Sequence, residues 1–109
     1  MKKAVLLVIT CAVACCFAAL TFAGEESGMK TGEQFFNEHC AACHPNGGNI
    51  INPEHTLHKN SMASHGIKTA DDIVSYLRSP GTGMPSFDKE KLPDERAREV
   101  ADYILDTFK

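Results

Sequence analysis

This sequence has few cysteines that could form a structural disulfide. Three of its five cysteines, Cys11, Cys15 and Cys16, lie in or beside an apolar run near the amino terminus, and the other two are Cys40 and Cys43. If the apolar run is removed, no thiol is left over for a structural disulfide. Because a domain of this size buries only a modest share of its surface, something else must complete its core.

Positive charge is also scarce. Two of the 11 Lys and Arg residues are Lys2 and Lys3, so residues 24–109 carry nine against 14 Asp and Glu, a net charge of −5. Nucleic acid and anionic membrane surfaces are therefore not expected as partners. A basic docking face on another protein is favoured, with charge steering that weakens as salt is added.

The chain has no internal repeat, no low-complexity run and no convincing strand candidate. Residues 24–30 are polar and contain glycine, which indicates a flexible tail, and residues 31–109 are expected to form one domain. The fold class predicted is all-α, with four to five short helices.

The first residues are typical of an export signal. Met1-Lys2-Lys3 precedes an apolar run over residues 4–22, and Ala23 ends a segment suited to cleavage. Residues 1–23 are therefore predicted to be a signal peptide whose removal leaves 86 residues. Lipid anchoring through a cysteine of the run is the second hypothesis, and an uncleaved membrane anchor is the third.

Two helices are predicted before residue 66. Thr31 and Gln34 resemble a capping box, which predicts a helix from about Gly32 to residue 40. A cap at Asn52 followed by Pro53 predicts a second short helix that extends towards residue 64.

Two further helices have apolar stripes at the 3.6-residue period. Thr69 and Asp72 open the third helix, and Ser79-Pro80 stops it. The last helix starts near Pro93. The apolar positions are Ala70, Ile73, Val74 and Leu77 in the third helix, and Ala97, Val100, Ala101, Ile104 and Phe108 in the last.

The most informative stretch is Cys40-Ala41-Ala42-Cys43-His44. A Cys-x-x-Cys-His sequence is typical of covalent haem attachment, in which each thiol adds to one vinyl group. The adjacent His44 can then ligate the iron through an imidazole nitrogen. A large apolar haem would also supply the missing core, because binding energy present only in the folded state stabilises that state.

Two other interpretations of the motif stay open. A thioredoxin-like thiol pair would need a neighbouring βαβ pattern, which the sequence lacks. A zinc site would need a second ligand pair, for which His55 and His58 are available.

Met84 is the predicted sixth ligand of the iron. It lies in Pro80-Gly81-Thr82-Gly83-Met84-Pro85-Ser86-Phe87, where prolines forbid helix and glycines allow backbone to approach a flat ring. Ligation by His and Met fills both axial positions and raises the reduction potential.

Several other residues compete with Met84. Met62 is expected in the core and Met29 in the tail. His55, His58 and His65 would lie along one face of a polar helix, where solvent exposure is the default, although bis-His ligation or a surface metal site is conceivable. His39 has no evident task.

These motifs resemble class I c-type cytochromes, and most of all the cytochrome c6 group with its relatives from metal-reducing bacteria. The resemblance runs from about Gly32 to Phe108 and includes a Met84-Pro85-Ser86-Phe87 ligand loop. It implies that Gly32 and Phe36 cross against Val100 and Tyr103. It also implies a haem pocket lined by Asn49, Ile51, Leu57, Pro85 and Phe87.

Three departures from the photosynthetic members, Pro45, His55 and Pro93, argue against a photosynthetic role. The resemblance alone favours an anaerobic respiratory chain instead. The predicted function is therefore that of a periplasmic one-electron carrier rather than an enzyme, with a single covalent haem c and small, transient contacts with redox proteins. The alternatives are a haem sensor or peroxidase-like enzyme with a labile methionine, and a haem-free thiol or zinc module.

Overall fold

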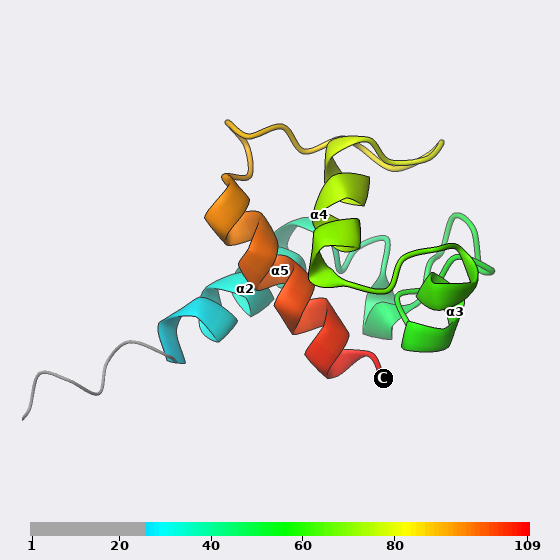
Figure 1. Ribbon diagram of the computed structural model, residues 1–109. Helices are drawn as coiled ribbons and strands as arrows, with labels where there is room; N and C mark the ends of the chain where they lie inside the picture. Colours follow the sequence, from blue (N-terminus) through cyan, green and yellow to red (C-terminus); the bar gives the residue numbers. More distant parts are fainter. Residues whose placement is uncertain (1–25) are drawn as a thin grey trace, which may run out of the picture.

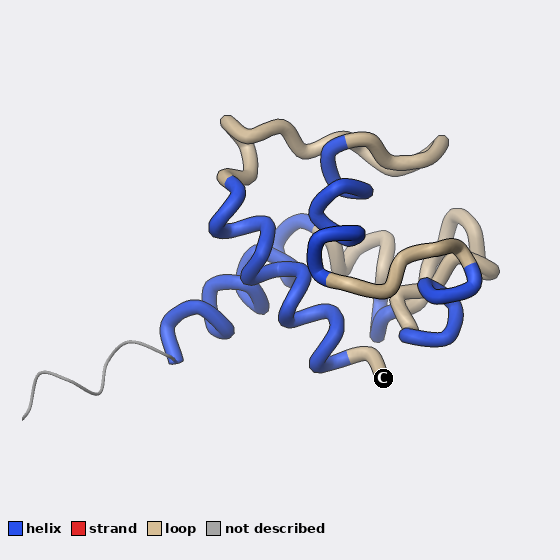
Figure 2. The backbone as a smooth tube through the Cα atoms, in the orientation of Figure 1, coloured by secondary structure: helices blue, strands red, loops and turns tan. Residues whose placement is uncertain are grey.

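The computed structural model describes residues 26–109, with side chains described from Thr31 onward. In order, its elements are α2 (Glu26–His39), the 3-10 turn η1 (Pro45–Gly47), α3 (Lys59–Ser64), α4 (Ala70–Arg78) and α5 (Asp94–Thr107). This part of the chain contains helices and loops and no strand, which confirms the all-α prediction (Figure 2). The predicted signal peptide, residues 1–23, lies outside the described residues. Among residues 26–109, no helix is long and apolar enough to cross a bilayer.

Helix α2 begins earlier than the sequence indicates. Residues 26–30, expected to be tail, are helical, and the expected start at Gly32 is wrong. Glu, Met and Lys are good helix formers, so their propensity extends the helix towards the amino terminus. Thr31 is therefore inside the helix, and its hydroxyl donates a hydrogen bond to Glu99 Oε2 of α5 at 2.7 Å.

Helices α2 and α5 cross closely and form the main helix pair of the domain (Figure 1). The crossing occurs at Gly32, where a Cβ would overlap the backbone carbonyl of Glu99. The predicted aromatic contact is present, because the rings of Phe36 and Tyr103 lie 5.4 Å apart. Phe36 and Val100 are both buried at this contact, so the arrangement implied by the resemblance is confirmed.

The sequence predicts α4 and α5 well. Thr69 and Asp72 form a complete capping box, and α4 ends at Arg78. Ile73 and Leu77 are buried, and α4 packs against α5. All five positions of the predicted α5 stripe are buried: Ala97, Val100, Ala101, Ile104 and Phe108.

The second predicted helix is much shorter than expected, because α3 begins only at Lys59. The expected start at Asn52 is wrong because the preceding backbone is bound elsewhere. Asn49 Oδ1 accepts hydrogen bonds from the amides of Ile51 and Asn52 at 3.0 and 2.9 Å. The amide of Leu57 donates to the Gly47 carbonyl at 2.7 Å. These bonds hold an irregular loop where a helix would need its own ladder.

The end of α5 closes on the loop after α2. Phe108 is buried, and its ring lies so close to Gly47 that a Cβ there would be 2.5 Å from Cδ1. Gly47 has a φ of +75°, which favours glycine on backbone grounds as well. The Phe108 carbonyl also accepts a hydrogen bond from the amide of Lys59 at 3.2 Å.

The long loop between α4 and α5 runs out from the end of α4 and returns to α5 over one side of the molecule (Figure 1). It contains Met84, as predicted, and begins at Ser79. Leu92, near its far end, is fully buried, so the loop is packed on the domain there.

Candidate functional site

A cavity of about 520 Å³ lies between α2, α4, α5 and the two long loops. This volume is typical of a cofactor or ligand site. All nine of the predicted site residues line it: Cys40, Cys43, His44, Asn49, Ile51, Leu57, Met84, Pro85 and Phe87. Residues separated by more than forty positions in the sequence therefore meet at one site.

The thiol end of the cavity is set by the way α2 stops. The amides of Cys40 and Ala41 both donate to the Phe36 carbonyl, at 2.8 and 2.9 Å. The next turn is closed by the His44 amide, which donates to the Cys40 carbonyl at 2.9 Å. The helix thus ends in tight turns that present Cys40, Cys43 and His44 to the same cavity.

His44 is buried, with 8% of its surface exposed, and one of its ring nitrogens has a partner. Its Nδ1–H donates to the Gly48 carbonyl at 2.8 Å, because a carbonyl can only accept. This bond fixes the tautomer and leaves Nε2 with a lone pair, which is the arrangement that metal-binding histidines usually have.

The chemistry of the thiols argues against a redox-active pair. Burial, reinforced by the neighbouring Cys43, raises the pKa of the Cys40 thiol to about 11. Reactive thiol pairs instead have lowered pKa values. Among the residues whose side chains are described, 31–109, no group of three or more His, Cys, Asp or Glu side chains is placed to hold a metal ion.

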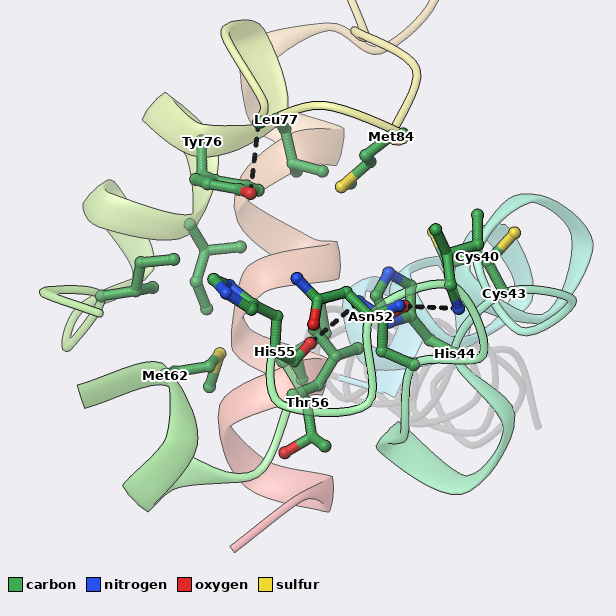
Figure 3. Close-up of a pocket in the computed structure, with 18 of the residues that line it drawn as sticks. Cys40, Cys43, His44, Asn52, His55, Thr56, Met62, Tyr76, Leu77 and Met84 are labelled. Carbon is green, nitrogen blue, oxygen red and sulfur yellow. Dashed lines mark hydrogen bonds between the residues drawn. The ribbon is translucent and has the colours of Figure 1, made fainter. Parts of the chain in front are cut away.

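Met84 reaches the cavity from a different part of the chain. Figure 3 shows its sulfur pointing inward from the loop that follows α4. Tyr76 and Leu77 of α4 lie beside it along the lining, and the Tyr76 hydroxyl accepts a hydrogen bond from the Gly81 amide at 3.2 Å.

Asn49 has a structural role that the sequence does not reveal. Besides binding the amides of Ile51 and Asn52, its Nδ2 donates to the His55 carbonyl at 3.0 Å. The side chain therefore braces the loop that carries Ile51 and Leu57 to the cavity. Ile51 is 59% exposed and lies at the rim.

The histidines are placed differently from the prediction. His55 and His58 precede α3, so the three do not share one helix face. All three are exposed, as expected, but His55 and His65 also line the cavity, with ring centroids 3.9 Å apart. His58 instead lies edge-on to Phe108, with ring centroids 6.2 Å apart.

Other lining residues were not identified as site residues from the sequence. Met62 is buried in the core, as predicted, yet it also faces the cavity. His39, which had no evident task, lines the cavity and packs on Phe35, with ring centroids 4.4 Å apart. The side chain of Met29 lies outside the described part. Three further lining residues, Ile73, Leu77 and Ile104, belong to the predicted apolar stripes of α4 and α5.

The arrangement fits a haem. The cavity is lined mainly by apolar side chains, together with two thiols, a fixed imidazole and the thioether of Met84. Cys40 and Cys43 are the residues that would hold the porphyrin covalently. No Lys, Arg, Asp or Glu lines the cavity, so the donor set consists of soft sulfur and imidazole nitrogen, which suit haem iron.

Comparisons with known proteins agree with this chemistry. Residues 27–104 match the family described as cytochrome c oxidase, cbb3-type, subunit III. Cytochrome c6 of Thermostichus vulcanus is 35% identical over 106 residues, covering 97% of this chain and 93% of its own. Cytochrome c6 of Leptolyngbya boryana is 41% identical over 75 residues, covering 69% and 87%.

Solved structures give the same result. OmcF, an outer membrane cytochrome from Geobacter sulfurreducens, superposes with a TM-score of 0.70 at 40% identity, covering 72% of this chain and 99% of its own. Cytochrome c6 from the diatom Phaeodactylum tricornutum superposes with a TM-score of 0.66 at 40% identity, covering 72% and 91%. The chain therefore belongs to the class I c-type cytochromes, as a cytochrome c6-like electron carrier with one covalently bound haem c.

Proposed function

We propose that this protein is a one-electron carrier whose haem iron is ligated by His44 and Met84. The observation that carries this proposal is that both side chains line one cavity together with Cys40 and Cys43. A bound haem would supply a one-electron iron couple, and ligation by both His44 and Met84 would leave no iron position open to a substrate.

The protein's own residues determine how the carrier works. The Gly48 carbonyl orients His44 and keeps Nδ1 protonated, so Nε2 is the ligating nitrogen. The apolar side chains of the lining would limit contact between the haem and water, and with it the solvent rearrangement that accompanies a change of charge. Ile50 and Ile51 are exposed next to the cavity, so one edge of the site stays close to the surface for electron transfer.

The ligand assignment is tested by the absorption spectrum of the ferric protein. We expect the weak long-wavelength band of methionine–iron ligation in the wild type, and its loss in Met84→Ala. Met62→Leu is the matched control, because Met62 is the other methionine in the lining and leucine keeps its volume. A band that survives in Met84→Ala, or disappears in Met62→Leu, would contradict the assignment. A high-spin wild-type spectrum would favour the sensor or peroxidase-like alternative.

We further propose that the carrier is exported and serves a periplasmic respiratory chain. The support is the signal-like character of residues 1–23 and the likeness to an outer membrane cytochrome. The mass of the purified mature protein tests this, because it reports cleavage after Ala23, any lipid and the covalent haem together. A mass that still includes residues 1–23 would refute cleavage, and an added lipid mass would establish anchoring through Cys11, Cys15 or Cys16.

We propose that the redox partner docks onto this protein through a basic face of the partner's own surface. Residues 24–109 carry a net charge of −5, while the cavity rim is uncharged, so attraction comes from the wider surface. The rate of oxidation by a cationic ruthenium ammine should fall as salt is added, and the rate with anionic ferricyanide should rise. The opposite pair of trends would exclude a basic partner face.

A further inference from the structure

The loop that carries Met84 is tied back to the last turn of α4 at two points. The Tyr76 hydroxyl accepts the Gly81 amide near the start of the loop, at 3.2 Å. The Leu77 carbonyl accepts the Phe87 amide at 2.9 Å. Met84 lies between these two hydrogen bonds. An interaction that holds Phe87 in place therefore limits how far the Met84 thioether can move away from the cavity.

Arg78, the last residue of α4, binds the far end of the same loop. Its Nη1 donates to three backbone carbonyls, those of Phe87 at 2.9 Å, Asp88 at 3.2 Å and Leu92 at 2.7 Å. Its Nη2 donates to Asp94 Oδ1 at 2.7 Å, at the start of α5. One planar guanidinium therefore joins the end of α4, the returning loop and α5.

The burial of Arg78 indicates that this arrangement is built rather than incidental. Its side chain is only 20% exposed, and its Nε is buried without a hydrogen-bond partner. An unmet buried donor costs free energy, so the charge-assisted bonds to the carbonyls must outweigh it. A simple cation at a helix C-terminus would bind the last carbonyls of its own helix, whereas Arg78 binds carbonyls of the segment that follows.

We propose that Arg78 is a positioning residue that holds the Met84 loop closed over the haem. This inference rests on the proposed ligation of iron by Met84. By fixing the carbonyls of Phe87 and Leu92, Arg78 anchors the loop beyond the thioether, while Tyr76 anchors it before. Lysine can replace it only in part, because an ammonium lacks the planar fork that reaches the carbonyls and Asp94 together.

The proposal predicts that loss of Arg78 makes Met84 easier to displace. Imidazole titration of the ferric protein, followed by absorption, measures this competition directly. In Arg78→Gln we expect imidazole to bind about tenfold more tightly than in the wild type, or tighter still, because several bonds to a charged donor no longer favour the closed loop. The imidazole affinity of Arg78→Lys should lie between those of the wild type and Arg78→Gln.

Arg98→Gln is the matched control. Arg98 Nη1 lies 2.8 Å from Asp71 Oδ1, so this pair also joins α4 to α5, but it does not touch the loop. Its side chain is half exposed, and we expect the imidazole affinity to stay at the wild-type value even if the melting temperature falls. A general loss of stability would move the melting temperatures of both variants, whereas a positioning role moves the imidazole affinity of the Arg78 variants alone.

The outcomes separate the two hypotheses. If Met84→Ala and the wild type bind imidazole equally tightly, Met84 is not the ligand and both proposals fail. If they differ but Arg78→Gln matches the wild type while keeping its helical circular dichroism, only the role of Arg78 is refuted. Should Arg78→Gln fail to fold, Arg78→Lys decides by the same comparison: tighter imidazole binding supports the role, and wild-type affinity refutes it.

Discussion

The crossing of α2 and α5 makes Gly32→Ala a severe substitution. The added Cβ would lie 2.7 Å from the carbonyl carbon of Glu99 and 3.2 Å from the Val100 amide nitrogen, and it would overlap the Glu99 oxygen. These are backbone atoms of a helix, so no side chain can swing aside. The two helices must move apart, or the substitution must be accommodated by bending them.

The size of the effect follows from two opposing terms. Overpacking of this kind costs about 1–3 kcal/mol, and rigid backbone favours the upper end. In the opposite direction, alanine stabilises the interior of a helix by about 1 kcal/mol relative to glycine. The net destabilisation should therefore be about 2 kcal/mol, which lowers the melting temperature by about 8–16 °C in a domain of this size.

Thermal unfolding of the haem-loaded protein, followed by circular dichroism, measures this change. Asn37→Ala, on the exposed face of the same helix, is the control and should stay within about 0.5 kcal/mol of the wild type. The absorption spectrum of Gly32→Ala should be unchanged, because the predicted ligands lie away from the crossing. If Gly32→Ala is as stable as the wild type or more stable, the reasoning about the helix contact is wrong.

Two further predictions concern acid stability and the role of haem in folding. The pKa of Asp72 is lowered from 3.8, chiefly by the backbone amide of Lys68 and then by the side chain and amide of Thr69. The ionised Asp72 carboxylate therefore stabilises the fold at neutral pH, and this contribution is lost as the pH falls below about 4 through the folded-state pKa. Asp72→Asn should be less stable than the wild type at pH 7. In acid the stabilities of the two proteins should converge. Parallel acid-unfolding curves would contradict this. Cys40→Ala combined with Cys43→Ala, purified without haem, should lose its near-UV circular dichroism because the apolar cavity has nothing to fill it, and a native-like signal would show that haem is dispensable for folding.

Sequence reasoning succeeded where the signal is local. The capping box of Thr69 and Asp72 and the stripes of α4 and α5 depend on residues three or four positions apart, so they can be recognised directly. The extent of α3 could not be recognised this way. The amides after Asn49 are bound by its side chain and by the Gly47 carbonyl, and these contacts become visible only when the loop is folded.

The same distinction holds for the site. Cys40, Cys43 and His44 are consecutive parts of one chemical motif, so the sequence alone identifies them. The role of Arg78 cannot be recognised from the sequence because its main acceptors are backbone carbonyls, which every residue has and which leave no compositional signal. The contact between the rings of His55 and His65 cannot be predicted either, because it depends on where α3 starts.

The contact between Phe108 and Gly47 connects the end of α5 to the environment of His44. The Phe108 ring occupies the space in which a side chain at position 47 would stand. The next residue, Gly48, supplies the carbonyl that orients the His44 imidazole. A substitution that removes the Phe108 ring should therefore disturb the imidazole as well as the helix pair.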